Sequence, residues 1–237
     1  MFFLGHISIA FVICYFIVRR FHLRDISLSL IMFFSILPDI DIVFRLLEID
    51  LAHRSITHSL IVFSIVWAVM LVKYRKPSFI IYSSAYLSHI VGDLIIGPLN
   101  LTYPFGYYFV SGVADFKAPE HLVLEGILLL IMATMVLGQY LRNRRMNTFP
   151  FGYTKIDTFF YPIVISALII SLFFVLDQSQ KELTEFPKSV FLLIQSPVDY
   201  KIIAIVVLHA FGIAVIIFLW IVSRRNTQIQ HLKKLPL

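Results

Sequence analysis

Seven apolar runs, each close to the length that crosses a lipid bilayer, follow one another along this chain of 237 residues. They cover approximately residues 2–18, 26–47, 56–72, 78–97, 121–141, 157–176 and 202–222. The hydrocarbon core of a bilayer is about 30 Å thick, and about 20 helical residues span it. The sequence therefore predicts an all-α, polytopic membrane protein with about seven transmembrane helices.

The composition agrees with a membrane protein, since 59% of the residues are hydrophobic and 14% are charged, whereas soluble domains are about 25% charged. The first run lacks a basic segment and a cleavage site, so we interpret it as a retained helix. We expect one membrane domain over 1–237, in which 1–141 carries the polar motifs described below and 142–237 adds further transmembrane helices. The single cysteine, Cys14, excludes a disulfide framework and a cysteine-based metal site.

The basic residues lie in short clusters between the apolar runs, so membrane topology explains the net charge of +6 and no nucleic-acid partner is expected. Short cytoplasmic loops retain Lys and Arg. With the N-terminus outside and the C-terminus inside, 14 of the 20 basic residues face the cytoplasm, which predicts that orientation. They are Arg19, Arg20, Arg24, Lys73, Arg75, Lys76, Arg142, Arg144, Arg145, Lys155, Arg224, Arg225, Lys233 and Lys234.

Several ionisable residues in these runs come at a similar depth. Counted at about 1.5 Å per residue from the cytoplasmic ends, they lie about 17 to 26 Å deep, in the outer half of the bilayer. Such groups cost at least about 2.5 to 3.5 kcal/mol each on insertion scales and usually face the bundle interior and carry function. We therefore expect a shared site recessed into the outer leaflet. It would include His6, Asp39, His58, His89 and Glu125, with His53 and His121 near its mouth.

Two residue pairs have the spacing of metal ligands on a helix. In YLSHIVGD, His89 and Asp93 are four residues apart, so both side chains lie on one helix face within reach of one ion. His121 and Glu125 repeat this spacing in EHLVLE. Hydrogen bonds between helices are the alternative explanation for either pair alone.

Two further motifs contribute carboxylates and imidazoles. PDID places Asp39 and Asp41 after Pro38, where regular helix is disfavoured and both carboxylates can turn inward; a simple helix-ending turn is the alternative. In HRSITHSL, His53 and His58 are five residues apart and converge only if His53 precedes the helix. The start of that helix is not fixed by the sequence, because Asp50, Ser55 and Thr57 can each cap it.

Other polar residues have simpler explanations when taken singly. Arg54 can extend to the lipid headgroups, and His6 can be an interfacial residue. His209 has no paired carboxylate on its helix, so we interpret it as a packed or hydrogen-bonded histidine. The remaining residues, taken together at one depth, favour a metal site over these separate explanations.

The motifs PDID, HRSITHSL and AYLSHIVGD, with Gly5 and His6 near the N-terminus, resemble the YdjM-like family of membrane-bound metal-dependent hydrolases over about residues 1–105. A more distant similarity links them to zinc-dependent phospholipases C and related nucleases. The resemblance implies metal ligands among His6, Asp39, Asp41, His53, His58, His89, Asp93, His121 and Glu125. Two departures from the phospholipase pattern, Leu99 with Asn100 in place of a histidine and the lack of an N-terminal tryptophan ligand, favour one or two ions over three.

Nitrogen and carboxylate ligands without thiolate suit Zn²⁺ best, and Mn²⁺ and Fe²⁺ accept the same donors. Such ions make hydroxide available near neutral pH, and a pair of them holds both oxygens of a phosphoester displacement. We expect the carboxylate of PDID that does not bind metal to act as general base, with Asp41 as the candidate. Arg54 is the candidate phosphate clamp, because guanidinium groups bind anions in a bidentate manner.

The expected function is hydrolysis of a phospholipid or lipid-linked phosphoester from the extracytoplasmic side of the cell membrane, without an obligate protein partner. Aromatic residues in the 98–120 connection fit an interfacial belt beside such a site, or simple anchoring. The alternative is a metal-ion transporter or a metal-stabilised scaffold that uses the same ligands without turnover. The cytoplasmic halves of the runs are almost unbroken apolar sequence, which favours a one-sided pocket over a conduction path.

Overall fold

The computed structural model describes residues 2–23, 26–41, 56–74, 76, 78–97, 99–105, 119–146, 151, 154–184 and 200–232. Within these ranges the chain is helical and contains no β-strand. The helices are α1 (Phe3–Arg20), α2 (Leu28–Ile36), α4 (Leu60–Tyr74), α5 (Ser78–Ile96), α6 (Pro119–Met146), α7 (Asp157–Thr184) and α8 (Tyr200–Leu232), with the 3-10 turns η1 (Leu37–Asp39) and η2 (Ile56–His58). The predicted all-α class is confirmed for the described residues.

Among the described residues, four helical segments are long and apolar enough to cross a membrane, namely Phe3–Arg20, Ser78–Ile96, His121–Leu141 and Ile203–Arg224. Shorter apolar helices over Leu28–Asp39, Leu60–Lys73 and Asp157–Leu172 occupy the other three apolar runs. Every predicted run therefore contains a helix. Seven full crossings and the N-out, C-in orientation stay predictions.

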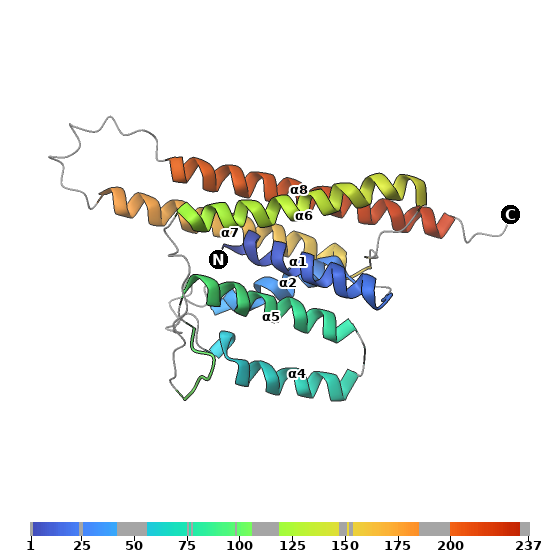
Figure 1. Cartoon of the computed structure of the whole chain (residues 1–237), viewed down its shortest axis with the longest axis horizontal. Coiled ribbons are helices and arrows are strands. Elements are labelled where there is room, and N and C mark those ends of the chain that lie inside the picture. Colours follow the sequence, from blue (N-terminus) through green and yellow to red (C-terminus); the bar gives the residue numbers. More distant parts are fainter. Residues whose placement is uncertain are drawn as a thin grey trace.

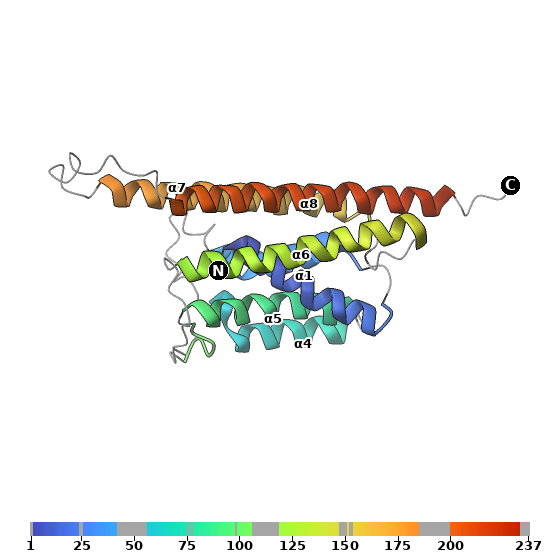
Figure 2. The same ribbon diagram turned by 45° about the horizontal axis from the view of Figure 1, so that its top comes forward.

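The helices lie side by side with their axes in roughly one direction (Figures 1 and 2). Helix α1 is at the centre, where it contacts α2, α5, α6 and α7, while α8 packs on α6 and α7. Ten of the 18 residues of α1 are buried, so this helix meets protein on most of its faces. Helix α4 lies at the periphery and contacts α5 and η2.

The change from α2 to η1 follows from Pro38. Proline has no backbone N–H and disfavours helical geometry at the residue before it, and α2 ends at Ile36, two residues earlier. The next turn, Leu37–Asp39, is a 3-10 helix with Pro38 in its first positions. The predicted break at this proline is confirmed, and it turns Asp39 into the protein, where only 5% of the residue is exposed.

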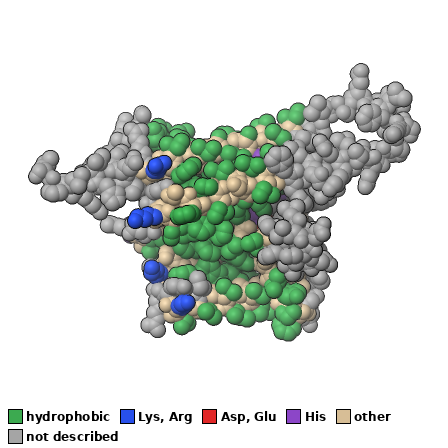
Figure 3. Space-filling view, turned by 180° about the vertical axis from the view of Figure 1, so that it is seen from behind, with side chains coloured by type: hydrophobic (Ala, Val, Ile, Leu, Met, Phe, Trp, Pro, Cys, Tyr) green, Lys and Arg blue, Asp and Glu red, His purple; other side chains and the backbone are tan. Residues whose placement is uncertain are grey.

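The two ends of the bundle differ in charge. The described basic side chains Arg19, Arg20, Lys73, Lys76, Lys155 and Arg224 are exposed, and Figure 3 shows the Lys and Arg side chains together at one end of a hydrophobic face. Exposed apolar side chains such as Val69 (60%) and Leu130 (59%) cover the flanks between the ends. A basic end and apolar flanks are the surface that a membrane-spanning bundle presents to a bilayer.

Candidate metal centre

Helix α5 supplies two of the residues at the end of the bundle opposite the basic residues. His89 and Asp93 lie one turn apart on the same buried face, and His89 Nε2 is 3.4 Å from Asp93 Oδ2. Both residues are almost completely buried. The pairing expected from the four-residue spacing is therefore present.

Asp39 reaches the same place from η1. Its Oδ1 atom lies 3.5 Å from His89 Nε2 and 3.5 Å from His58 Nε2. Helix α2 packs against α5, and the 3-10 turn after Ile36 directs the Asp39 carboxylate onto the α5 face that carries His89. The break at Pro38 therefore positions the Asp39 carboxylate beside His58 and His89.

His58 comes from η2, immediately before α4. Ser59 caps α4, because its hydroxyl accepts hydrogen bonds from the backbone N–H groups of Ile61 (3.2 Å) and Val62 (3.4 Å). The helix therefore begins later than the candidate caps Asp50, Ser55 and Thr57 suggested. His58 lies ahead of the helix, where its ring points into the bundle and is fully buried.

These four residues form one compact group of donor atoms. His58 Nε2 lies 3.1 Å from His89 Nε2 and 3.2 Å from Asp93 Oδ2, and all four donor atoms lie within 4.8 Å of one another. Ligands bound tetrahedrally at about 2.0–2.1 Å, as in zinc sites, are about 3.3–3.4 Å apart. The five distances within the group that involve a histidine nitrogen, from 3.1 to 3.5 Å, match that spacing.

The hydrogen bond made by His89 Nδ1 shows where a proton lies on this ring. His89 Nδ1 lies 2.7 Å from the backbone carbonyl oxygen of Ser35. A carbonyl oxygen only accepts hydrogen bonds, so Nδ1 carries a proton, and Nε2 presents a lone pair to the group when the ring is neutral. Two carboxylate oxygens that converge in a buried place need a positive charge beside them, which a protonated imidazole or a bound cation would supply.

His58 is oriented in a similar way. Its Nδ1 atom lies 3.1 Å from the Thr57 hydroxyl and 3.9 Å from Asp41 Oδ2, and the Thr57 hydroxyl donates to the same Asp41 oxygen. The Tyr86 hydroxyl donates to the backbone carbonyl of Thr57. Carboxylates and carbonyls behind a metal-binding histidine fix its ring and raise its basicity. Asp41 thus lies behind His58 and is not one of the four donors.

His6 borders the group without belonging to it. Its ring stacks on the ring of His89 with 3.6 Å between centroids, and His6 Nε2 is 3.3 Å from Asp93 Oδ1. Asp93 therefore points one carboxylate oxygen, Oδ2, toward His58 and His89, and the other, Oδ1, toward His6. Both ring nitrogens of His6 are buried without a hydrogen-bond partner in the described part of the chain.

His121 and Glu125 form a separate pair on α6, with 2.8 Å between His121 Nε2 and Glu125 Oε1. Glu125 also accepts a hydrogen bond from the backbone N–H of Phe2, whose ring stacks on His121. His209 touches the other side of Phe2, and its Nδ1 donates to the backbone carbonyl of Ile205. The structure therefore places this pair beside the start of α1 and does not bring it into the four-residue group.

Two predicted site residues, His53 and Arg54, lie outside the described residues, as do Tyr107, Tyr108 and Phe109 of the aromatic connection. Sequence reasoning missed Ser35 and Tyr86. Ser35 contributes through its backbone carbonyl, which any residue possesses, so its identity gives no signal. Tyr86 lies one turn before His89, on the part of α5 that faces η2, and this position could have drawn attention to it.

The donor set suits a borderline divalent ion. Two imidazole nitrogens and two carboxylate oxygens are ligands that Zn²⁺, Mn²⁺ and Fe²⁺ accept. The single cysteine, Cys14, is buried in α1 and its thiol donates to the Ile81 carbonyl, so it is not part of the group. The four residues could hold one such ion, because their number, spacing and burial all fit it.

A family model described as YdjM inner membrane protein matches residues 1–221 of the chain. The chain therefore belongs to this family, and the match extends well beyond the motifs of residues 1–105. No curated protein and no solved structure matches the chain significantly, so the similarity to zinc-dependent phospholipases C finds no support in these comparisons.

Proposed function

We propose that this member of the YdjM inner membrane protein family is a divalent metal-dependent hydrolase that cleaves a lipid phosphoester. The proposal depends on one observation, the convergence of Asp39, His58, His89 and Asp93 at the spacing of a single ion. A buried group of acceptors at one end of an apolar bundle is costly to maintain, and such groups in membrane proteins usually serve function.

A divalent ion bound in this group supplies activation of water near neutral pH and polarisation of a phosphoryl oxygen. The protein provides the orientation. The Ser35 carbonyl holds the ring of His89, and Thr57 with Asp41 holds that of His58. Because the four residues are buried, charges placed here would interact more strongly than they would in solvent.

The two carboxylates of PDID receive different roles. Asp39 contributes a ligand atom, whereas Asp41 faces the Nδ1 side of His58. The position of Asp41 supports a role in orienting His58, and action as general base is the further role proposed for it. Arg54 remains the proposed phosphate clamp, which would contact the substrate from the segment that precedes η2.

A membrane lipid is the substrate class that this location favours. The group lies at the bundle end opposite the basic residues, so the N-out orientation would place it in the outer leaflet, near the phosphate of a lipid. A soluble phosphoester would have to leave water to reach donors that are at least 95% buried.

A metal-stabilised scaffold is the second candidate, and the number of ligands favours it. Structural zinc sites have four protein ligands, while catalytic sites usually keep a position open. The four residues come from η1, η2 and α5, so an ion here would also join these elements.

One experiment separates the two candidates. Wild-type protein, Asp93→Ala and Arg54→Ala are purified in detergent, analysed for metal and incubated with a panel of phospholipids and lipid phosphates, with products identified by mass. The hydrolase predicts that Asp93→Ala loses metal and turnover, while Arg54→Ala keeps its metal and loses about 10²- to 10³-fold in rate. Metal-loaded wild-type protein without turnover on any lipid, or a wild-type rate in Arg54→Ala, would favour the scaffold.

A further inference from the structure

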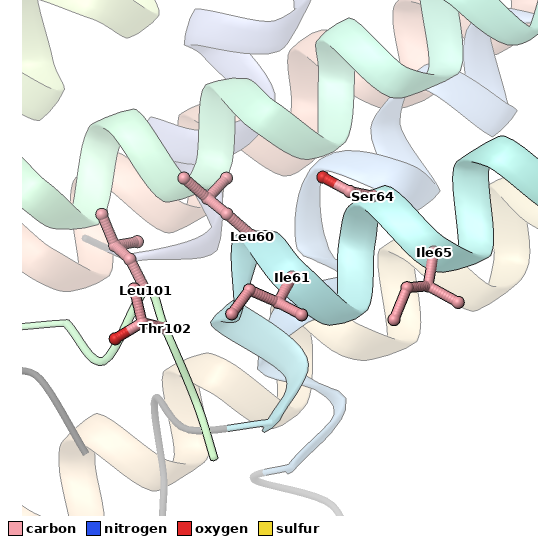
Figure 4. Close-up of a pocket in the computed structure, with 6 residues that line it drawn as sticks. All are labelled: Leu60, Ile61, Ser64, Ile65, Leu101 and Thr102. Atoms are coloured by element: carbon pink, nitrogen blue, oxygen red, sulfur yellow. The ribbon is translucent and has the colours of Figure 1, made fainter. Parts of the chain in front are cut away.

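An apolar cavity of about 420 Å³ lies between the first turns of α4 and the segment that follows α5. Figure 4 shows Leu101 and Thr102 beside Leu60 and Ile61, with Ser64 and Ile65 one turn further along α4. The volume falls in the range of roughly 300–1,000 Å³ that small-molecule sites occupy.

Hydrogen bonds hold the two walls of this cavity together. The backbone N–H of Leu60 donates to the Leu101 carbonyl at 2.9 Å, and the Ser59 hydroxyl donates to the Tyr103 carbonyl at 3.0 Å. Ser59 directly follows His58, a member of the four-residue group. The cavity therefore begins within two residues of the candidate metal site, and its position relative to that site is fixed.

The face of α4 around the cavity is apolar and exposed. Ile65 is 61% exposed, Val66 53% and Val69 60%. In a membrane protein such a face contacts the hydrocarbon of lipids, because its exposure to water would be unfavourable. The cavity consequently opens toward lipid chains, and a hydrocarbon chain is the occupant that matches its lining.

The cavity lining is largely apolar, since four of its six residues are Leu or Ile and the other two are Ser64 and Thr102. The hydroxyl oxygen of Thr102 is buried against the protein. The lining therefore offers apolar contact and no charged group to a ligand.

We propose that this cavity binds an acyl chain of the lipid substrate, so that the lipid phosphate lies at the four-residue group while one tail lies along α4. The inference rests on the proposed function and adds a specificity element to it. Substrates with long acyl chains are preferred, because apolar contact along Leu60, Ile61 and Ile65 contributes binding that a short chain does not make.

A binding measurement tests the tail site without relying on turnover. Full-length protein is reconstituted in vesicles of phosphatidylethanolamine and phosphatidylglycerol that contain a phospholipid with a diazirine in its acyl chain, and cross-links are mapped by mass spectrometry. We expect labelling at residues 60–65 and 101–102 to exceed that at Val69 and Val72. Ser64→Phe fills the cavity and should lower the labelling at least about fivefold, while Ala68→Phe, one turn further along, should not. Uniform labelling of α4, or labelling that Ser64→Phe leaves unchanged, would overturn the inference.

Turnover of long- and short-chain phosphoesters is then compared in the same variants. With metal content equal to wild type, Ser64→Phe should lower the rate on long chains by about tenfold and leave that on short chains unchanged. Selective cross-linking without turnover in the wild type would retain the tail site and reject the hydrolase. An equal long-chain turnover rate in the wild type and Ser64→Phe, together with uniform cross-linking of α4, would support the hydrolase and reject the tail site.

Discussion

The two ends of the bundle each bury an aspartate among polar groups, but the two clusters differ in their balance of donors and acceptors. At the basic end, Asp157 Oδ1 accepts hydrogen bonds from the Ser27 hydroxyl (2.7 Å) and from the hydroxyl (2.6 Å) and backbone N–H (3.2 Å) of Ser29. Asp157 Oδ2 accepts from the hydroxyl (2.7 Å) and backbone N–H (2.6 Å) of Thr154. Five donors surround this carboxylate, so it needs no cation.

At the other end, the atoms that converge come from two carboxylates and two imidazole rings. Oxygens of Asp39 and Asp93 meet the ring nitrogens of His58 and His89, and the Ser35 carbonyl already takes the proton of His89 Nδ1. The comparison shows that the role of a buried carboxylate depends on how many hydrogen-bond donors its neighbours supply. A carboxylate surrounded by donors stabilises the fold, whereas carboxylates that face histidine nitrogens could share a bound cation with them.

Helix α2 connects the two clusters. Ser27 caps α2 at the basic end by accepting the backbone N–H of Leu30, and at the opposite end the chain continues through η1 to Asp39. The hydrogen bonds to Asp157 therefore fix the helix that delivers one ligand to the candidate metal site.

The largest expected effect concerns which membrane face each end meets. The native Cys14 is buried, so single introduced cysteines report cleanly. Phe105→Cys, at a residue 69% exposed beside the metal end, should react with an impermeant maleimide on intact cells. Lys155→Cys, at the basic end, should react only after permeabilisation. The reverse pattern would place the metal end in the cytoplasm and remove the argument for an outer-leaflet lipid.

The second-largest expected effect is the loss of stability when Asp157 and its hydrogen bonds to Ser27, Ser29 and Thr154 are removed. Each hydrogen bond to a charged group contributes about 1.5–3 kcal/mol, so Asp157→Ala should lower the free energy of unfolding by at least about 3 kcal/mol. Denaturant titration in detergent measures this change, and metal analysis of the same sample should show unchanged binding in the folded fraction. Loss of metal equal to that of Asp93→Ala would erase the distinction between the two clusters.

A smaller effect is expected for Asp41→Asn, which alters the support of His58 and leaves the four donors in place. Loss of such a supporting contact typically costs 10- to 100-fold in metal affinity, or about 1.4–2.7 kcal/mol. Competition with a chelator of known affinity measures it. Asp39→Asn is the matched variant and should lose more, because it removes a ligand; equal losses would show that the PDID carboxylates share one role.

The smallest effects concern the packing that positions α1 at the metal end. A Cβ atom added at Gly212 would overlap the side chain of Leu4, whereas one at Gly138 meets no described residue within 4 Å. Gly212→Ala should therefore destabilise by about 1–3 kcal/mol through overpacking, and Gly138→Ala should be neutral or stabilising by up to about 1 kcal/mol. Thermal unfolding in detergent compares the two. Equal thermal unfolding midpoints for the two variants would mean that α1 and α8 pack less tightly at Gly212 than the structure shows.

Much of this arrangement could be predicted from local sequence. The apolar runs predicted the helices, Pro38 predicted the end of α2, and the four-residue spacing predicted that His89 and Asp93 share a face. Each of these features depends on residues within one or two turns of one another, so periodicity and proline chemistry determine them.

The rest depends on how helices are arranged around one another. Depth along the bundle suggested that His121 and Glu125 join the other candidates, but depth does not give lateral position, and α6 places this pair beside Phe2. Nothing in the sequence singled out Asp157, which lies two residues after Lys155. Its donors Ser27 and Ser29 are more than 120 residues away, so no local pattern reveals them.

The central claim is that the four acceptors hold a divalent ion, and metal analysis with X-ray absorption of the purified protein tests it most directly. Wild-type protein, after passage through metal-free buffer, should retain at least one ion per chain, with nitrogen and oxygen neighbours at about 2.0–2.1 Å and the scattering of imidazole rings. His89→Ala should retain almost none, and Asp157→Ala should retain as much as the wild type. Wild-type protein that is folded, metal-free and unchanged in stability on metal addition would contradict the claim and show that protons bridge the four acceptors instead.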